Sequence, residues 1–204
     1  KKFSIQDPRT RSFMMEWFGH KLFEKEDVLT TRYQFKVVYI NGVNRGVYAL
    51  EEHFDKRLLE NRKRREGPIV KFDESGVWQG YYDQQKYQQG FKKFPYLESA
   101  EILPFGKKRT RKNPTLLNQF VLAQSHMTRF RNLDTAFQEY LDLDKMARFI
   151  ALCDVMNATH GLIWHNQRNY LNPINGVLEP VAYDCFSGQP SIHYELLGIA
   201  SRWR

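Results

Sequence analysis

Residues 153–188 read CDVMNATHGLIWHNQRNYLNPINGVLEPVAYDCFSG, and this stretch decides the expected fold. It predicts the end of an apolar helix, a polar loop rich in His and Asn, and then a β-hairpin. The first strand is expected over 168–171, and the Asn-Gly pair at 175–176 is typical of a tight turn. The return strand, 177–183, alternates enough to be half-buried and places Asp184 at its end.

The polar loop and the strand end carry hard oxygen donors. Kinase folds hold nucleotide-bound magnesium with an Asn from the catalytic loop and an Asp at a strand end. Asn169 and Asp184 fit these two positions and are the candidate metal ligands. The residues alone leave an alternative open, in which His160, His165 and Asn169 are ordinary polar loop residues and Asp184 is a turn former.

The composition indicates a protein with a core and an excess of positive charge. The chain has 204 residues, 42% hydrophobic and 15% aromatic, which suits one domain or a domain with a large insertion. No apolar run approaches the length of a membrane span. The net charge of +8 favours polyanionic partners, but the basic runs at 62–65 and 107–112 are expected to be solvated loops. Two cysteines do not suggest a disulfide framework.

The remaining patterns predict an α+β order of elements with segregated lobes. The expected elements are a strand at 3–6, a helix at 9–26 capped by Asp7-Pro8, a β-hairpin at 34–50 turning at Asn41-Gly42, a helix at 55–64, a strand at 69–72, and helices at 115–130, 133–140 and 141–156, the last capped by Asp142 or Asp144.

The helix at 9–26 has apolar residues at helical spacing on one face. The side chains expected to be buried are Phe13, Met14, Trp17, Phe18, Leu22 and Phe23. Glu16 lies beside that face, where the plainer interpretation is a surface carboxylate.

Residues 73–112 show little regular period and are interpreted as an insertion packed on the domain. Within them, QGYYDQQKYQQGFKKFPY at 79–96 interleaves aromatic residues with Lys, as single-strand nucleic-acid platforms do. The insertion is the favoured interpretation. A nucleic-acid partner is therefore not expected, and it would reveal itself by binding that collapses with salt.

Three stretches together resemble the CotH family of spore-coat-type atypical protein kinases. They are KKFSIQDPRTR at 1–11, INGVNRGVYALEEHFDKRLLENRKRREGPIVKFDE at 40–74 and HNQRNYLNPINGVLEPVAYD at 165–184. The resemblance implies a two-lobed kinase-like fold whose first small-lobe strands and Gly-rich loop are expected to be absent from this chain. It also implies three units: a partial small lobe and hinge at 1–54, a linker helix and insertion at 55–114, and a helical large lobe at 115–204 with the catalytic loop and metal-binding hairpin.

The resemblance further implies an enzyme, secreted or attached to the cell envelope, that binds ATP with Mg²⁺ and phosphorylates protein Ser or Thr hydroxyls. Asp184 and Asn169 would be its metal ligands. Glu51 and Glu52 stand where the hinge follows the small-lobe hairpin, so their backbone would face the adenine.

The lysine that neutralises phosphate charge has two candidates. The resemblance favours Lys2, with Glu16 as its partner on the following helix. Lys71 is the rival, because it too stands in a short strand near the hinge.

The catalytic base is the main departure from the kinase pattern. A typical kinase loop has its catalytic Asp five positions before the metal-binding Asn, and here that position is Trp164. The nearest side chains able to take a proton are His160 and His165. A metal site built on these two histidines is disfavoured, because their spacing fits no helical ligand pair and no carboxylate stands close by.

Two hypotheses of different classes therefore remain. A phosphotransferase predicts Mg²⁺-dependent ATP binding that is lost in Asp184→Ala. A kinase-like pseudoenzyme, acting as a structural or surface-interaction domain, predicts a melting temperature that does not respond to ATP and Mg²⁺. The sequence leaves the acceptor and the oligomeric state open.

Overall fold

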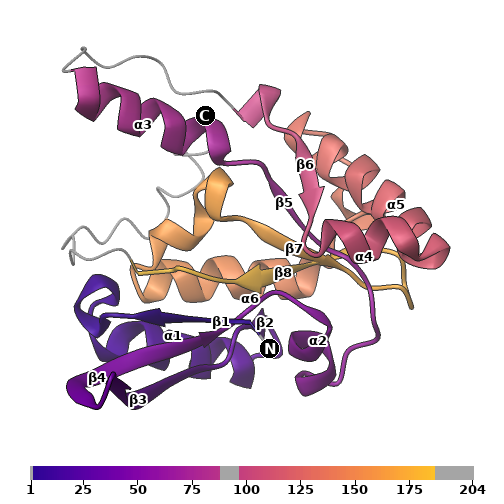
Figure 1. Ribbon diagram of the computed structural model, residues 1–204. Coiled ribbons are helices and arrows are strands. Elements are labelled where there is room, and N and C mark those ends of the chain that lie inside the picture. The colour runs from indigo at the N-terminus through magenta and orange to yellow at the C-terminus, as the bar shows by residue number, and fades with distance from the viewer. Residues whose placement is uncertain (1, 88–96, 187–204) are drawn as a thin grey trace.

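The computed structural model describes residues 2–87 and 97–186, which form two β-sheets with helices around them (Figure 1). The three-stranded sheet has the order β1-β4-β3, and the five-stranded sheet the order β2-β8-β7-β5-β6. The mixed α+β class expected from the sequence is confirmed. Among the described helices, none has the length and apolar character that crossing a membrane requires.

The bounds of the elements follow the chain order. The strands are β1 Phe3–Gln6, β2 Leu29–Thr30, β3 Tyr33–Ile40, β4 Val43–Glu52, β5 Ile69–Phe72, β6 Ile102–Pro104, β7 Arg168–Leu171 and β8 Leu178–Ala182. The α-helices are α1 Met14–Lys25, α2 Lys56–Asn61, α3 Ser75–Tyr87, α4 Lys107–Lys112, α5 Pro114–Arg131 and α6 Leu143–Val155. Short 3₁₀ helices are η1 Pro8–Arg11, η2 Leu97–Ser99, η3 Phe137–Glu139, η4 Thr159–Leu162 and η5 Trp164–Asn166.

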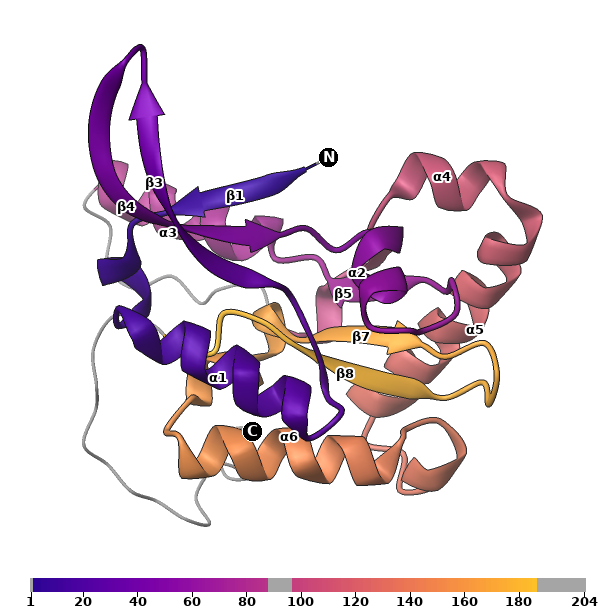
Figure 2. The same cartoon turned by 90° about the horizontal axis from the view of Figure 1, so that it is seen from below.

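The smaller sheet is built around the predicted β3–β4 hairpin, whose tip projects away from the rest of the chain (Figure 2). Its turn residues Asn41 and Gly42 have φ of 52° and 79°, the positive values that a tight hairpin turn requires. Strand β1 pairs with the other edge of β4, with Ser4 opposite Glu51. The sequence signals for these strands were local, and the predictions hold.

The helix expected over 9–26 is divided in two, and its buried face differs from the expected one. Ser12 and Phe13, with φ of 52° and 56°, separate η1 from α1. The buried face of α1 carries Glu16, Gly19, His20 and Phe23. Of the side chains expected to be buried, Phe13, Met14 and Phe18 are exposed at 61%, 60% and 47%, Trp17 and Leu22 are half-buried, and Phe23 is buried as predicted. The buried face was therefore predicted only in part, because Glu16 turns toward the backbone N–H groups of the segment that follows β8.

The larger sheet carries the β7–β8 hairpin, which was also predicted. Strand β7 lies between β8 and β5, and the two-residue β2 runs parallel to β8 with Thr30 opposite Ala182. Helix α6, capped by Asp142 as expected, packs against β8, and α5 packs against β5, β6 and β7. The sheet therefore takes strands from all three of the units expected from the sequence.

The sequence missed several elements between β5 and α6. Residues 73–112, expected to be irregular, contain α3, β6 and α4, so the basic run at 107–112 is a helix and not a loop. Glycine and glutamine dilute the helical period of α3, and part of the 79–96 stretch lies outside the described residues. The helix expected at 133–140 reduces to η3, because Leu133 has a φ of 57° and Asp134 caps the N–H of Ala136 instead.

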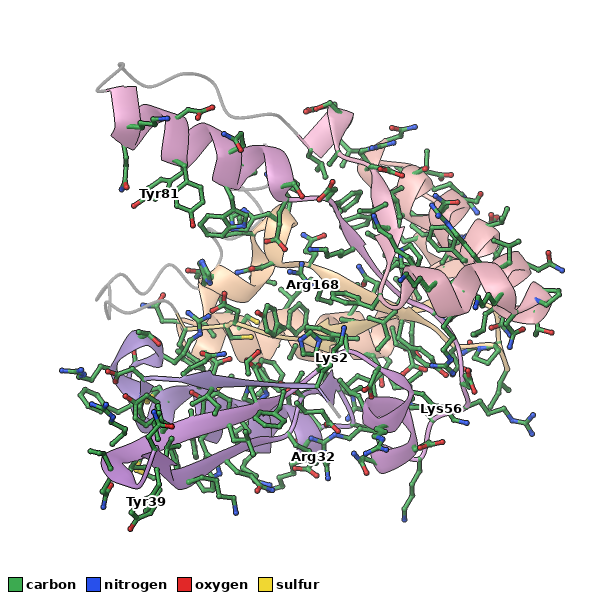
Figure 3. All side chains as sticks on the ribbon, viewed as in Figure 1. Lys2, Arg32, Tyr39, Lys56, Tyr81 and Arg168 are labelled. Atoms are coloured by element: carbon green, nitrogen blue, oxygen red, sulfur yellow. The ribbon has the colours of Figure 1, made fainter. Side chains whose placement is uncertain are left out.

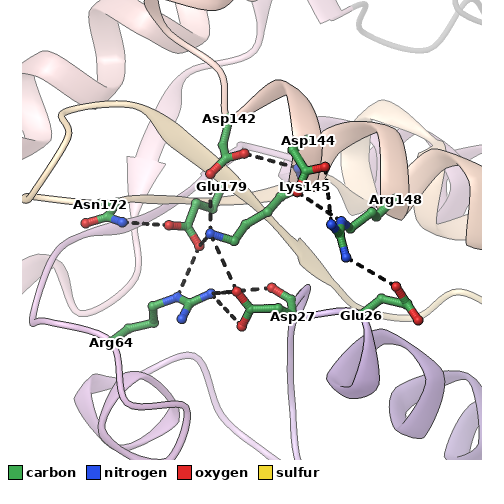
Figure 4. A network of polar contacts seen from close by, with 9 residues as sticks. All are labelled: Glu26, Asp27, Arg64, Asp142, Asp144, Lys145, Arg148, Asn172 and Glu179. Carbon is green, nitrogen blue, oxygen red and sulfur yellow. Dashed lines mark hydrogen bonds and ion pairs between the residues drawn. The ribbon is translucent and has the colours of Figure 1, made fainter.

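A buried ion network joins β8, α6 and the loop after α2 (Figure 4). The Glu179 side chain has no exposed area and lies 3.2 Å from Arg64 Nε and 3.3 Å from Lys145 Nζ. Asn172 Nδ2 donates to its other oxygen at 2.7 Å. In the basic run at 62–65, Arg62 pairs with Glu24 and Arg64 with Glu179. The run is a loop, as expected, but these two arginines are structural and not free surface charges.

Candidate functional site

Asp184 follows β8 in the left-handed region, with a φ of 49°. Its side chain is 12% exposed, and its Oδ1 lies 3.0 Å from Nη1 of Arg11 and 3.4 Å from Nδ1 of His160. Neither contact has the geometry of a hydrogen bond, so Oδ1 is buried without a hydrogen-bond partner within the described residues. This oxygen is therefore paired with Arg11 by charge and not by a hydrogen bond.

The loop formed by η4 and η5 brings His160 and Asn166 to Asp184. His160 Nδ1 lies 2.7 Å from the backbone O of Asp184 and 2.8 Å from Asn166 Nδ2, and the ring tautomer decides which of the two contacts is a hydrogen bond, because the carbonyl accepts and the amide donates. Asn166 Nδ2 also lies 3.1 Å from the backbone O of His160 and 3.5 Å from Asp184 Oδ2. Gly161 allows this close approach, because a Cβ there would stand 2.7 Å from Cys185 Sγ. The amide beside Asp184 is therefore that of Asn166.

Asn169, the amide selected from the sequence, lies elsewhere. It is the second residue of β7, 6% exposed, and its Nδ2 is 3.3 Å from Met127 Sδ on α5. The strand begins at Arg168, so Asn169 is already inside the sheet and its side chain turns away from the loop. The structure brings Asn166, three positions earlier, to Asp184 and does not bring Asn169 there.

Taking Asn166 instead of Asn169 as the amide beside Asp184 also changes the position at which a catalytic base is expected. Five positions before Asn166 stands Gly161, directly after His160. Trp164 instead packs edge-on against Phe72, with ring centroids 6.4 Å apart. His160 is thus the titratable side chain beside the base position in the observed loop.

The two loop histidines differ in their electrostatic surroundings. Burial lowers the pKa of His160, but its contacts with Asp184 outweigh that effect and raise the pKa above its usual value. The pKa of His165 is lowered, with burial as the largest cause. The two ring centroids are 6.1 Å apart, and only His160 touches Asp184.

Glu16 is 2% exposed and holds the backbone just beyond Asp184. It accepts hydrogen bonds from the N–H of Cys185 at 3.3 Å and of Phe186 at 3.0 Å, and His20 Nε2 lies 3.2 Å away. Burial raises the pKa of Glu16, but His20 and the Phe186 N–H outweigh burial and lower it. The surface interpretation of Glu16 was wrong.

Neither candidate lysine lies beside Glu16 or Asp184. Lys2 is exposed at the start of β1 (Figure 3) and forms no ion pair within the described part of the chain. Lys71 Nζ lies 2.6 Å from Glu74, which also pairs with Arg168 at 3.1 Å. The permanent cation that touches Asp184 is Arg11. Sequence reasoning missed Arg11, which stands at the end of η1 within the stretch expected to be one helix.

The hinge carboxylates make local contacts. Glu51 accepts from Gln6 Nε2 at 2.6 Å and from Thr31 Oγ1 at 3.0 Å, and burial raises its pKa to about 7. Glu52 bonds Arg32 at 2.8 Å and Asn61 at 2.7 Å. In the sheet, Glu51 lies between Ser4 on β1 and Tyr33 on β3. A contact between this hinge backbone and adenine remains a prediction.

The site fits a divalent cation that brings other ligands with it. The described residues hold no cluster of three or more His, Cys, Asp or Glu side chains that could bind a metal by themselves. Mg²⁺ in phosphoryl-transfer sites is commonly held by one or two carboxylates together with substrate phosphates and water. Asp184 supplies such a carboxylate, and Asn166 could add only its Oδ1, because the Nδ2 that faces Asp184 carries hydrogens and cannot bind a metal.

The fold and the site together indicate a class of protein. The chain is an α+β protein in which a β-hairpin delivers a buried carboxylate to a loop bearing His160 and Asn166. Among protein families, the profile described as CotH kinase protein matches residues 4–194. The chain therefore belongs to the CotH kinase family, which implies a kinase-like fold and suggests kinase activity. A comparison with curated proteins found no match.

Proposed function

We propose that this protein is a phosphotransferase of the CotH type, which uses ATP with Mg²⁺ and transfers phosphate to protein Ser or Thr hydroxyls. The observation that carries the proposal is the convergence of His160, Asn166 and Asp184, with Asp184 Oδ1 buried and free of hydrogen bonds. Membership of the CotH kinase family supports it. The proposed compartment, the cell envelope or the exterior, rests on the family alone.

Each residue has a specific task in this proposal. Asp184 and Asn166 would hold the metal, which neutralises charge on the phosphates. Glu16 fixes the backbone that follows Asp184 through two N–H groups. In the tautomer whose Nδ1 donates to Asp184 O, His160 would receive the hydroxyl proton of an acceptor through Nε2. Phosphoryl transfer depends more on positioning and charge neutralisation than on base strength, so a histidine suffices.

Thermal unfolding with and without Mg²⁺ and ATP tests the metal-nucleotide site. At a hundredfold excess over the dissociation constant, ligand should stabilise the wild type by about 2.7 kcal/mol, a shift of several degrees. We expect the shift to disappear in Asp184→Ala and in Asn166→Ala but to persist in Asn169→Ala, which is the matched control. Loss of the shift in Asn169→Ala alone would return the metal-binding role to the residue selected from the sequence.

A pseudoenzyme is the second candidate, because Gly161 occupies the position of the usual catalytic Asp. It shares the family and the fold but predicts no transfer. Incubation with γ-labelled ATP and a mixture of Ser- and Thr-containing proteins, with Asp184→Ala as the blank, separates the two. Label transferred by the wild type and not by the variant supports the enzyme. Magnesium-dependent nucleotide binding with no transfer to protein, water or the chain itself supports the pseudoenzyme.

A further inference from the structure

Arg11 and Asp184 form an ion pair that no element of the sequence analysis anticipated. Nη1 of Arg11 lies 3.0 Å from Asp184 Oδ1, and the two side chains are 21% and 12% exposed. The same oxygen lacks a hydrogen bond of normal geometry. The guanidinium therefore neutralises the carboxylate without holding it in the paired geometry that Arg and carboxylate usually adopt.

The backbone on both sides of this pair is held in uncommon conformations. Ser12 and Phe13 directly follow Arg11 with φ of 52° and 56°, and Asp184 has a φ of 49°. Positive φ at a non-glycine residue is strained backbone, which persists only where the surrounding structure enforces it. The reversal at Ser12 and Phe13 allows Arg11 and Glu16 to reach the same short segment, 184–186.

The charges around this segment are unbalanced. Glu16 and Glu51 are buried, the Asp184 side chain is 12% exposed, and Arg11 is the permanent cation that contacts Asp184. Arg11 also lowers the pKa of both Glu16 and Glu51, so its field reaches all three. Nearby cations are committed elsewhere, since Lys71 and Arg168 both pair with Glu74.

We propose that Arg11 is the phosphate-binding residue of the site. Its guanidinium pairs with Asp184, and when a divalent cation binds the carboxylate, Arg11 would turn to the phosphate oxygens. A guanidinium presents five donors in a planar fork that matches phosphate, so the same side chain serves both partners. This inference rests on the proposed function, and it assigns to Arg11 the task that the sequence had suggested for Lys2 or Lys71.

The assignment predicts opposite effects on two ligands. In Arg11→Met, affinity for the Mg²⁺ complex of a non-hydrolysable ATP analogue should fall about ten- to hundredfold, the loss expected for hydrogen bonds to a charged group. Affinity for Mn²⁺ alone, measured by electron paramagnetic resonance, should instead rise severalfold, because the cation no longer competes with a guanidinium. Calorimetry supplies the nucleotide measurement, and neither readout requires turnover.

Two further variants complete the design. Arg9→Met is the matched control, since Arg9 lies two positions away on η1 and pairs only with Asp7 among its described contacts. It should leave both affinities unchanged. Arg11→Lys keeps the charge but loses the fork, and should recover part of the nucleotide affinity while weakening Mn²⁺ binding relative to Arg11→Met.

The outcomes separate the two proposals. If the wild type binds no Mg²⁺-nucleotide, both the proposed function and this assignment fail. If it binds and Arg11→Met binds equally well, the assignment alone fails. If Arg11→Met loses metal and nucleotide affinity together, Arg11 merely supports the Asp184 segment and the assignment is overturned. Weaker nucleotide binding with tighter Mn²⁺ binding establishes it.

Discussion

Acidic residues lie at both ends of β8, and the two ends differ in how their carboxylates are paired. At Glu179, a fully buried carboxylate is surrounded by Arg64, Lys145 and the amide of Asn172 (Figure 4). At Asp184, the partner Arg11 also acts electrostatically on the buried Glu16 and Glu51, and one Asp184 oxygen has no hydrogen bond within the described residues. Both oxygens of Glu179 are paired, whereas only one oxygen of Asp184 is hydrogen-bonded. This contrast separates a structural ion network from a candidate binding site.

The largest expected effect is at Glu179. Glu179→Gln leaves Arg64 and Lys145 partly buried beside a neutral side chain, and removing one partner of a buried pair typically costs about 3–5 kcal/mol. Since Arg64 and Lys145 both retain Asp27 nearby, we expect the free energy of unfolding, measured with urea, to fall by about 3 kcal/mol. Asp144→Asn, on the exposed Arg148 pair, is the control and should change stability by less than about 0.5 kcal/mol. An equal loss in both variants would contradict the structural role of Glu179.

An intermediate effect should appear in the pH dependence of the carboxylates near Asp184. The pKa of Glu51 is raised from 4.5 to about 7, chiefly by burial and also by Glu16, while His20, Thr31 and Arg11 act in the opposite direction. The folded state therefore keeps this proton longer, and the associated stability is lost as pH rises through 7. Between pH 5 and pH 8, the wild type should lose about 2–3 kcal/mol of unfolding free energy relative to Glu51→Gln.

Parallel denaturation of the wild type and Glu51→Gln at several pH values measures this difference. A wild type that gains stability over Glu51→Gln as pH rises would show that Glu51 is ionised and well compensated. The negative charge near Asp184 would then be compensated as well as that of Glu179, and the two ends of β8 would differ less.

The smallest effect is expected at Asp184 itself. Asp184→Asn is isosteric, as Glu179→Gln is, but it removes one of three carboxylates on which Arg11 acts. Without metal or nucleotide we expect its free energy of unfolding to stay within about 1 kcal/mol of the wild type, a change of only a few degrees in Tm. A loss as large as that of Glu179→Gln would mean that charge is equally balanced at the two ends of β8 and would break the comparison.

The sequence predicted the elements whose signals are local. Both β-hairpins follow from Asn-Gly pairs between β-prone runs, and the cap of α6 follows from Asp142 before an apolar period. The face of α1 could not be predicted in this way. The partners of Glu16 are N–H groups 169 and 170 positions away, so its burial depends on a contact that no local period encodes.

The roles of the site residues remain predictions. The strand that precedes Asp184 was predicted from its pattern, and family membership supports the expected class of activity. Asn169 was selected although the sequence already predicted it within the strand at 168–171, and the amide that the structure brings to Asp184 is that of Asn166 in the loop. The cation was sought among lysines in strands, whereas the arginine that pairs with Asp184, Arg11, comes from a 3₁₀ helix.

Glu16 on α1 and Arg11 at the end of η1 contact one short segment, the first through its backbone and the second through the Asp184 carboxylate. The position of Asp184 therefore depends on how these two helices, separated by Ser12 and Phe13, pack against that segment. A misplacement of about 1 Å in a reacting group can cost about a hundredfold in rate. In the proposed phosphotransferase, a change in the packing of α1 and η1 would therefore affect turnover more than it affects folding.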